Sequence, residues 1–176
     1  MRQVRYNVAM SLDGYIADSQ GRFDWILNDD TVDFAALFAR VDTFILGRRT
    51  YETVLANGEV PWQPGTRVYV ISRSLPAGSR DGVTVVADDP VGLTKSLRHE
   101  SGDGEIWLFG GGQLFAELLA ADQVDTVEIT VVPVLLGGGV PVVTALPARA
   151  PLELTGSHVY PSGMVALHYS VPAASR

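Results

Sequence analysis

Ile106-Trp107-Leu108-Phe109-Gly110-Gly111-Gly112-Gln113-Leu114 joins an apolar run through three glycines to a helical pattern. It predicts a strand over 105–109 and a helix over 113–119, with the glycines at the turn. Backbone N–H groups at such a helix start carry the positive end of the helix dipole, and glycine leaves them open to a pyrophosphate. A tight strand-to-helix turn that needs positive φ explains the same glycines equally well. The spacing also differs from the G-x-G-x-x-G dinucleotide motif, and it lies late in the chain.

The same order of strand, glycine and helix occurs at Ile45-Leu46-Gly47-Arg48-Arg49-Thr50-Tyr51, here with two arginines. An arginine fork binds phosphate through paired hydrogen bonds, each worth about 1.5 to 3 kcal/mol. A further strand ends in Ser72 and Arg73, a hydroxyl and a guanidinium that suit the 2′-phosphate of NADP. Two glycine-bearing helix starts indicate a ligand with separated phosphates. Taken singly, each feature is also explained by solvated arginines or by a plain strand end.

The rest of the chain alternates short β-branched runs with helical patterns, which predicts an α/β fold. We expect a mostly parallel central sheet flanked by helices, with an antiparallel hairpin at the C-terminus. A polar loop is expected over 11–28, and Asp30 is the expected N-cap of a helix over 31–41, with Phe34 on its apolar face. The expected strands are 5–10, 43–46, 67–72, 83–87, 105–109, 126–132, 152–160 and 164–171, and the other expected helices are 50–55, one opened by Asp89-Pro90, and 113–119.

The composition limits the kinds of protein that this chain can be. Its 176 residues suit one domain over 1–176, and 47% hydrophobic with 19% charged residues support a packed core. A net charge of -7, with the basic residues scattered, argues against binding to nucleic acid. No long apolar run and no signal-peptide pattern occur, so we expect a cytoplasmic protein that does not bind membranes. Because there is no cysteine, thiolate zinc sites, iron–sulfur clusters and disulfides are excluded, and we expect no metal.

Five stretches occur in an order and spacing that extend over nearly the whole chain. They are S-L-D-G-Y-I-A at 11–17, L-G-R-R-T-Y at 46–51, P-G-T-R-V-Y-V-I-S-R at 64–73, F-G-G-G-Q-L-F at 109–115 and V-D-T-V-E-I-T-V-V-P-V-L-L-G-G-G at 124–139. In this combination the chain resembles the dihydrofolate reductase superfamily, and especially its riboflavin-biosynthesis reductase branch, as a stand-alone domain. The resemblance implies a dihydrofolate-reductase-like fold, NADPH as the cofactor and, as is common in that branch, a homodimer.

The resemblance also assigns residues to the cofactor. It implies that Val8, Ala9 and Ile16 contact the nicotinamide. The adenosine-side phosphates would be held by Gly47, Arg48, Arg49, Thr50, Ser72 and Arg73, and the pyrophosphate by Gly110, Gly111, Gly112, Gln113 and Leu114.

The substrate residues are also taken from the resemblance. Dihydrofolate reductases place an acid four residues before an aromatic, and Asp30 with Phe34 reproduces that spacing. Asp30 would be catalytic, because a carboxylate can bind the amidine edge of a pterin or pyrimidine and favour protonation of the ring nitrogen. Asp30 also suits a helix cap, and Asp33 competes with it for the catalytic role. Trp25 resembles an aromatic beside the substrate, although a core or lid tryptophan fits as well, and Thr130 matches a residue that helps to anchor the acidic contact.

We therefore expect hydride transfer from NADPH to a C=N or C=O carbon of a small pyrimidine- or pterin-like heterocycle, as in 5-amino-6-(5-phosphoribosylamino)uracil reductase. A true dihydrofolate reductase and a non-catalytic NADP-binding module are the alternatives. Residues 53–59 (T-V-L-A-N-G-E) stand where riboflavin-pathway reductases carry a D-D-P-x-L-type stretch, which counts against substrates with a ribityl phosphate. The deaminase domain of the bifunctional enzymes is missing, so we expect only the reductase activity.

Overall fold

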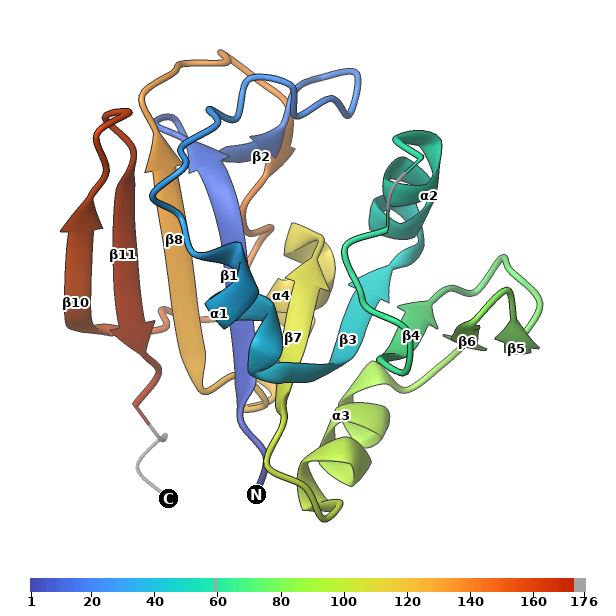
Figure 1. Cartoon of the computed structure of the whole chain (residues 1–176). Helices are drawn as coiled ribbons and strands as arrows, with labels where there is room; N and C mark the ends of the chain where they lie inside the picture. Colours follow the sequence, from blue (N-terminus) through green and yellow to red (C-terminus); the bar gives the residue numbers. More distant parts are fainter. Residues whose placement is uncertain (59, 173–176) are drawn as a thin grey trace.

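A nine-stranded sheet forms the centre of the computed structural model, which describes residues 1–58 and 60–172 (Figure 1). Glu59, the last residue of the 53–59 stretch, lies outside the described residues. The strands of the sheet are β1 (Val4–Ser11), β3 (Val41–Gly47), β4 (Arg67–Ile71), β5 (Gly78–Arg80), β6 (Val83–Val86), β7 (Glu105–Gly110), β8 (Thr126–Val132), β10 (Glu153–Val159) and β11 (Val165–Ser170).

The order of the strands is β10-β11-β8-β1-β7-β3-β4-β6-β5. From β8 through to β6 the neighbouring strands run parallel, whereas β11, β10 and β5 each pair antiparallel with a neighbour. The predicted mostly parallel sheet with an antiparallel C-terminal hairpin is therefore confirmed. Because six strands run the same way, their carboxyl ends meet at one edge of the sheet, which is where ligands bind in open α/β folds.

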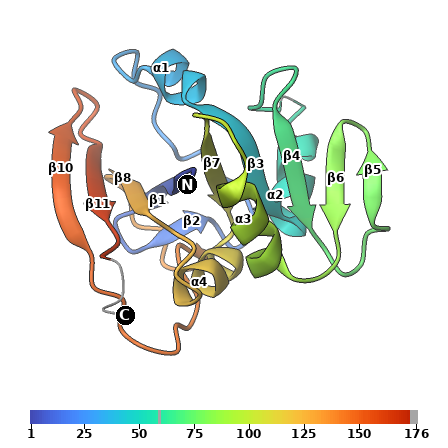
Figure 2. The same cartoon turned by 90° about the horizontal axis from the view of Figure 1, so that it is seen from below.

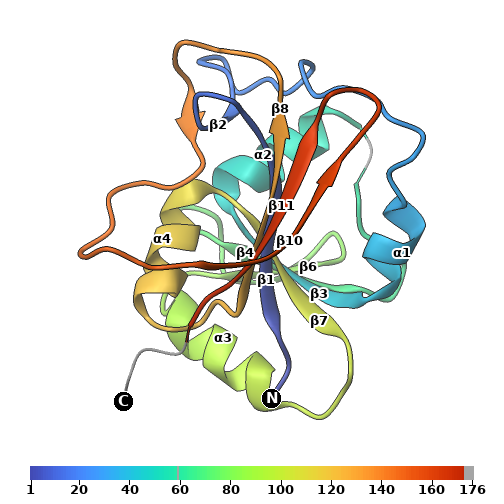
Figure 3. The ribbon, with the colours of Figure 1, turned by 90° about the vertical axis from the view of Figure 1, so that its left-hand side faces the viewer.

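Helices cover both faces of the sheet. α1 (Phe34–Ala39) and α2 (Arg48–Ala56) pack on one face, and α3 (Pro90–His99) and α4 (Gly112–Ala120) on the other. Figures 2 and 3 show α1 and α4 on opposite sides of the sheet. Side chains alternate along a strand, so Tyr6 of β1 stacks on Phe115 of α4, with ring centroids 3.8 Å apart. The neighbouring Arg5 faces the α1 side, where its guanidinium lies over Trp107.

A second, small sheet joins two loops at the carboxyl ends of the strands. It consists of β2 (Tyr15–Ala17) and β9 (Val140–Pro141), which pair antiparallel. The carboxylate of Asp13 strengthens this junction, since it accepts hydrogen bonds from Gly137 N at 2.7 Å and Leu136 N at 3.1 Å. The loop predicted over 11–28 thus contains a short strand. None of the helices described in this structure has the length and apolar character that a membrane crossing requires.

The predicted start of α1 is wrong. The helix begins at Phe34, and its N-cap is Asp33, whose side chain accepts a hydrogen bond from Ala36 N at 2.8 Å. Asp30 does not cap it, because the preceding turn is formed by Asp29, which accepts from Thr31 N at 3.0 Å. Such an Asx turn supplies the backbone with partners other than a helix. The predicted place of Phe34 on a buried apolar face of the helix is also wrong, since 54% of its surface is exposed.

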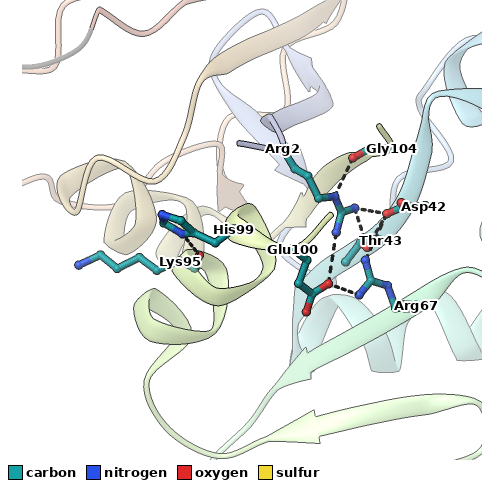
Figure 4. A network of polar contacts seen from close by, with 8 residues as sticks. All are labelled: Arg2, Asp42, Thr43, Arg67, Lys95, His99, Glu100 and Gly104. Carbon is teal, nitrogen blue, oxygen red and sulfur yellow. Dashed lines mark hydrogen bonds and ion pairs between the residues drawn. The ribbon is translucent and has the colours of Figure 1, made fainter. Parts of the chain in front are cut away.

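A network of charged groups ties the elements together at the opposite, amino-terminal edge of the sheet (Figure 4). Arg2, of which only 4% is exposed, donates to Gly104 O at 2.9 Å and to Thr43 Oγ1 at 3.0 Å, and it pairs with Asp42. Glu100, at the end of α3, pairs with Arg67 at the start of β4. This network joins the chain before β1 to β3, β4 and α3, far from the edge where the parallel strands finish.

Candidate active site

A large cleft follows the edge at which the parallel strands finish. Its lining includes Gly47 at the end of β3, Ser72 after β4, Ala87 after β6 and Gly111 after β7. The volume of the cleft is about 1810 Å³. Pockets for one drug-sized ligand measure roughly 300–1,000 Å³, so this cleft has room for two molecules side by side.

Two helix N-termini lie next to each other in this cleft. Gly47 is the N-cap of α2 and Gly111 is the N-cap of α4, and the strands that lead to them, β3 and β7, are neighbours. Neither residue has a side chain that could bond to the first-turn N–H groups, so these donors are available to an anion. Among the described residues outside its own chain neighbours, a Cβ built on Gly111 would meet Thr50 Oγ1 alone, at 3.6 Å. The two helix starts therefore form one continuous surface, and glycine keeps the approach to it open.

Three arginines border this part of the cleft, which we call the glycine half. Both carboxylate oxygens of Glu52 accept from Arg48 Nη1 at 2.8 Å. Arg49 and Arg73 are exposed and make no ion pair within the described residues. Ser72 is buried, and its hydroxyl oxygen accepts from Leu75 N at 2.9 Å and from Ser74 N at 3.2 Å, with Ser74 Oγ 3.4 Å away. Guanidinium groups and unbonded N–H donors are the chemistry that binds phosphate.

The structure brings nearly all of the predicted cofactor residues to this cleft. The cleft-lining ones are Val8, Ala9, Ile16, Gly47, Arg48, Arg49, Thr50, Ser72, Arg73, Gly111, Gly112, Gln113 and Leu114. Gly110 is buried below the lining. Its φ of 125° lies in the region that favours glycine, so its place in the motif follows from the backbone.

The other part of the cleft lies on the α1 face of β1, β8 and β11, and we call it the carboxylate half. Its floor holds Glu128, whose side chain is 14% exposed. Oε2 of Glu128 accepts from Asn7 Nδ2 at 2.6 Å and lies 3.4 Å from Arg5 Nη1. Oε1 has His168 Nδ1 at 3.8 Å, which is beyond hydrogen-bonding distance. Asn7, Glu128 and His168 are direct cross-strand neighbours.

Sequence reasoning missed this cluster. Its signal is a glutamate between Val127 and Ile129, on a strand whose other residues are valine, isoleucine and threonine, opposite the polar Arg5 and Asn7 on β1. A buried charge is costly unless it is paired, so such residues indicate partners on neighbouring strands. The strand order that brings β11 and β1 to either side of β8 is a long-range property that local patterns do not contain.

Two acids before α1 also line the carboxylate half. They are Asp29 and Asp33, whereas Asp30 is exposed and lies outside the lining. Asp29 accepts from Ser162 N at 3.0 Å, and the hydrogen bonds from Ser162 and Thr31 hold the pKa of Asp29 well below its usual value. This contact ties the start of α1 to the turn between β10 and β11.

Of the other predicted substrate residues, Phe34 and Thr130 line the cleft and Trp25 does not. Trp25 is half-buried, and its indole Nε1 donates to Arg22 O at 3.2 Å within its own loop. Within residues 1–58 and 60–172 no three His, Asp or Glu side chains group closely enough to hold a metal ion.

Comparison with known proteins gives consistent results. The family described as RibD C-terminal domain matches residues 2–166. The chain is 35% identical over 166 residues to protein YwjB of Bacillus subtilis, covering 92% of this chain and 94% of the relative. A Shewanella sp. PV-4 protein named for riboflavin biosynthesis has 32% identity and a TM-score of 0.83, with 98% of this chain and 100% of that chain covered.

A Thermotoga maritima diaminohydroxyphosphoribosylaminopyrimidine deaminase/5-amino-6-(5-phosphoribosylamino)uracil reductase shares the fold. It has 19% identity and a TM-score of 0.68, and the match covers 97% of this chain but 57% of that longer one.

Proposed function

Because the chain belongs to the RibD C-terminal domain family, we propose that it is a reductase that uses NADPH to reduce a small nitrogen heterocycle related to pyrimidines and pterins. The observation that carries the proposal is the pair of uncapped helix N-termini at Gly47 and Gly111, which open side by side into one cleft. A dinucleotide has two linked phosphates, and this surface offers N–H donors from two helices to them.

We assign the glycine half to NADPH. Gly111, Gly112, Gln113 and Leu114 would hold the pyrophosphate, with Gly110 supporting the turn below them. Gly47, Arg48, Arg49 and Thr50 would bind the adenosine-side phosphates, and Ser72 with Arg73 the 2′-phosphate. The nicotinamide would lie against Val8, Ala9 and Ile16, where the two halves of the cleft meet. When bound, NADPH supplies the hydride.

The substrate would occupy the carboxylate half, next to Ala9. Phe34 and Thr130 line this part of the cleft and would contact it. Asp30, the acid predicted from the spacing, is exposed outside the lining, so we propose that Asp33 takes the role of the α1 carboxylate. It would orient the heterocycle and favour a proton on the ring nitrogen. Trp25 lies in the loop before α1 and outside the cleft lining, so it would contact the substrate from that loop and not from the cleft wall.

Titration with NADPH tests the proposal directly. Saturating NADPH at about 100 times its Kd stabilises a protein by about 2.7 kcal/mol, so the melting temperature is expected to rise, and emission from the cleft-lining Trp107 to fall. An unchanged melting temperature and emission would overturn the proposal. Oxidation of NADPH, followed at 340 nm with pterins and pyrimidinones, then identifies the substrate.

The same measurements separate the two alternatives. Turnover of dihydrofolate with inhibition by methotrexate would identify a true dihydrofolate reductase. Binding of NADPH without oxidation by any heterocycle would identify a non-catalytic NADP-binding module.

We also propose that the protein acts in the cytoplasm as a homodimer. Support comes from β10, which lies at the edge of the sheet with apolar side chains in solvent: Leu154 is 60% and Val159 68% exposed. Both pair with residues of β11 whose side chains point to the α4 face. An exposed edge strand with apolar residues suits self-association. Light scattering should give the mass of two chains, and Leu154→Glu should reduce it to one.

A further inference from the structure

The two halves of the cleft differ in their unpaired arginines. In the glycine half, Arg49 and Arg73 make no ion pair within the described residues, whereas Arg48 pairs with Glu52. The carboxylates of Asp88, Asp89 and Glu117 also line the cleft. The carboxylate half also has two arginines, Arg5 and Arg40, but both pair with Glu105, and Arg5 contacts Glu128 as well. Asp29 and Asp33 add two further carboxylates to the lining. An anionic group bound in this half would therefore meet carboxylates and no unpaired guanidinium of the lining.

Glu128 has one oxygen that is available to a ligand. Oε2 is occupied by Asn7, whereas Oε1 makes no hydrogen bond within the described residues and is not among the fully buried atoms. The guanidinium of Arg5, of which 1% is exposed, lies 3.4 Å from the same carboxylate. A carboxylate on the floor of a cleft is a strong acceptor for N–H groups.

The residues around Glu128 leave room for a flat ring. The next row of the sheet consists of Ala9, Thr130 and Ala166, which are cross-strand neighbours on the same face. Two alanines give a shallow floor, and the hydroxyl of Thr130 lies between them. Aromatic and apolar side chains form the walls of this half, namely Phe34, Leu37, Trp107, Phe109, Tyr160 and Met164. Such walls with a few polar groups suit a planar heterocycle.

We propose that the carboxylate half binds a phosphate-free heterocycle, neutral or cationic, whose neighbouring N–H groups donate to Glu128. This rests on the proposed reductase function, because it names the substrate class for the same cleft. Glu128 is thus a residue that determines specificity: it selects amino-substituted rings and, with Asp29 and Asp33, rejects substrates that carry a ribityl phosphate there.

Glu128→Gln and Glu105→Gln are a matched pair for the test. Both carboxylates contact the buried Arg5, but only Glu128 lines the cleft. Loss of the Arg5 contact should lower the melting temperature in both variants. Calorimetric titration of NADPH-saturated protein with 2,4-diaminopyrimidine should give an affinity that falls about 10- to 100-fold in Glu128→Gln and is unchanged in Glu105→Gln. If Glu128→Gln does not fold, Glu128→Asp keeps the charge near Arg5, withdraws it from the cleft and should also weaken binding.

Uridine 5′-monophosphate tests the exclusion of phosphate. It should bind to NADPH-saturated wild-type protein at least about tenfold more weakly than 2,4-diaminopyrimidine. Tighter binding of the monophosphate, equal binding of diaminopyrimidine to wild type and Glu128→Gln, or no binding of diaminopyrimidine would overturn the inference. Titration of the same proteins with NADPH alone separates the two proposals: protein that binds NADPH but not diaminopyrimidine contradicts only the inference. Protein that binds diaminopyrimidine through Glu128 but not NADPH contradicts only the reductase function.

Discussion

Gly111 and Gly112 are adjacent in the chain, but side chains at the two positions would meet different surroundings. A Cβ on Gly111 would extend toward the cleft and lie 3.6 Å from Thr50 Oγ1, an ordinary van der Waals contact. A Cβ on Gly112 would lie 2.5 Å from Pro141 O, a backbone atom that cannot move alone. The absence of a side chain at Gly111 therefore leaves the cleft open to a ligand. At Gly112 it allows α4 to pack closely against β9.

Substitution at these two positions should separate binding from stability. Gly111→Val is expected to abolish the NADPH-dependent rise in melting temperature and to leave the ligand-free melting temperature nearly unchanged. Gly112→Ala should destabilise the protein by about 1 to 3 kcal/mol, because overpacking forces the backbone to shift. Thermal unfolding with and without NADPH measures both effects. A Gly111→Val protein that binds NADPH like wild type would contradict the proposed binding of the pyrophosphate at the start of α4.

The acids near α1 can be distinguished by replacing each with asparagine. Asn caps helices about as well as Asp, so Asp33→Asn removes the charge and keeps the α1 cap. We expect kcat/KM for the identified heterocycle to fall by about 100-fold or more in Asp33→Asn. Asp30→Asn, at an exposed position outside the cleft, is the control and should leave kcat/KM unchanged. The reverse result would restore the catalytic role to Asp30.

At the level of elements, the β10–β11 hairpin and α1 meet through Asp29 and Ser162. Hydrogen bonds from Ser162 and Thr31 hold the pKa of Asp29 well below the 3.8 of a free aspartate. Because the folded pKa is lowered, this carboxylate stabilises the fold above its unfolded pKa, and the contribution is lost as pH falls through the folded pKa. Asp29→Asn should therefore flatten the fall in melting temperature below about pH 4. The control is Asp24→Asn in the preceding loop, and an acid limb as steep in Asp29→Asn as in this control would contradict the assignment.

The elements that sequence predicts well are those with local causes. The strand, glycine and helix order at Gly47 and at Gly111 is set by neighbouring residues, and Asp89 caps α3 as expected. The short strands β2, β5 and β9 were not predicted, because two or three residues show no periodicity and β2 pairs with a partner far along the chain. The α1 boundary was missed because the Asp29 turn competes with helix formation. The Glu128 cluster depends on strand order, which lies beyond any local pattern.

Over the whole molecule, the charged groups at the two ends of the sheet differ in whether they are paired. Charged groups at the amino-terminal edge, around Arg2, are paired with one another (Figure 4). At the carboxyl edge, Arg49 and Arg73 lie exposed at the cleft without ion-pair partners among residues 1–58 and 60–172. Paired buried charges contribute to folding, whereas unpaired exposed ones are available to a ligand.

This division predicts opposite effects for two arginine-to-methionine changes. Arg2→Met should cost about 1 to 3 kcal/mol, equivalent to roughly 2–12 °C in melting temperature, because Gly104 O and Thr43 Oγ1 lose a buried donor. Its Kd for NADPH should not change, since the network lies at the edge remote from the cleft. Arg49→Met should leave the melting temperature unchanged and weaken NADPH binding by about tenfold or more. Thermal unfolding and fluorescence titration of both variants provide the check, and an Arg2→Met protein that is stable but binds NADPH weakly would show that the two ends are coupled.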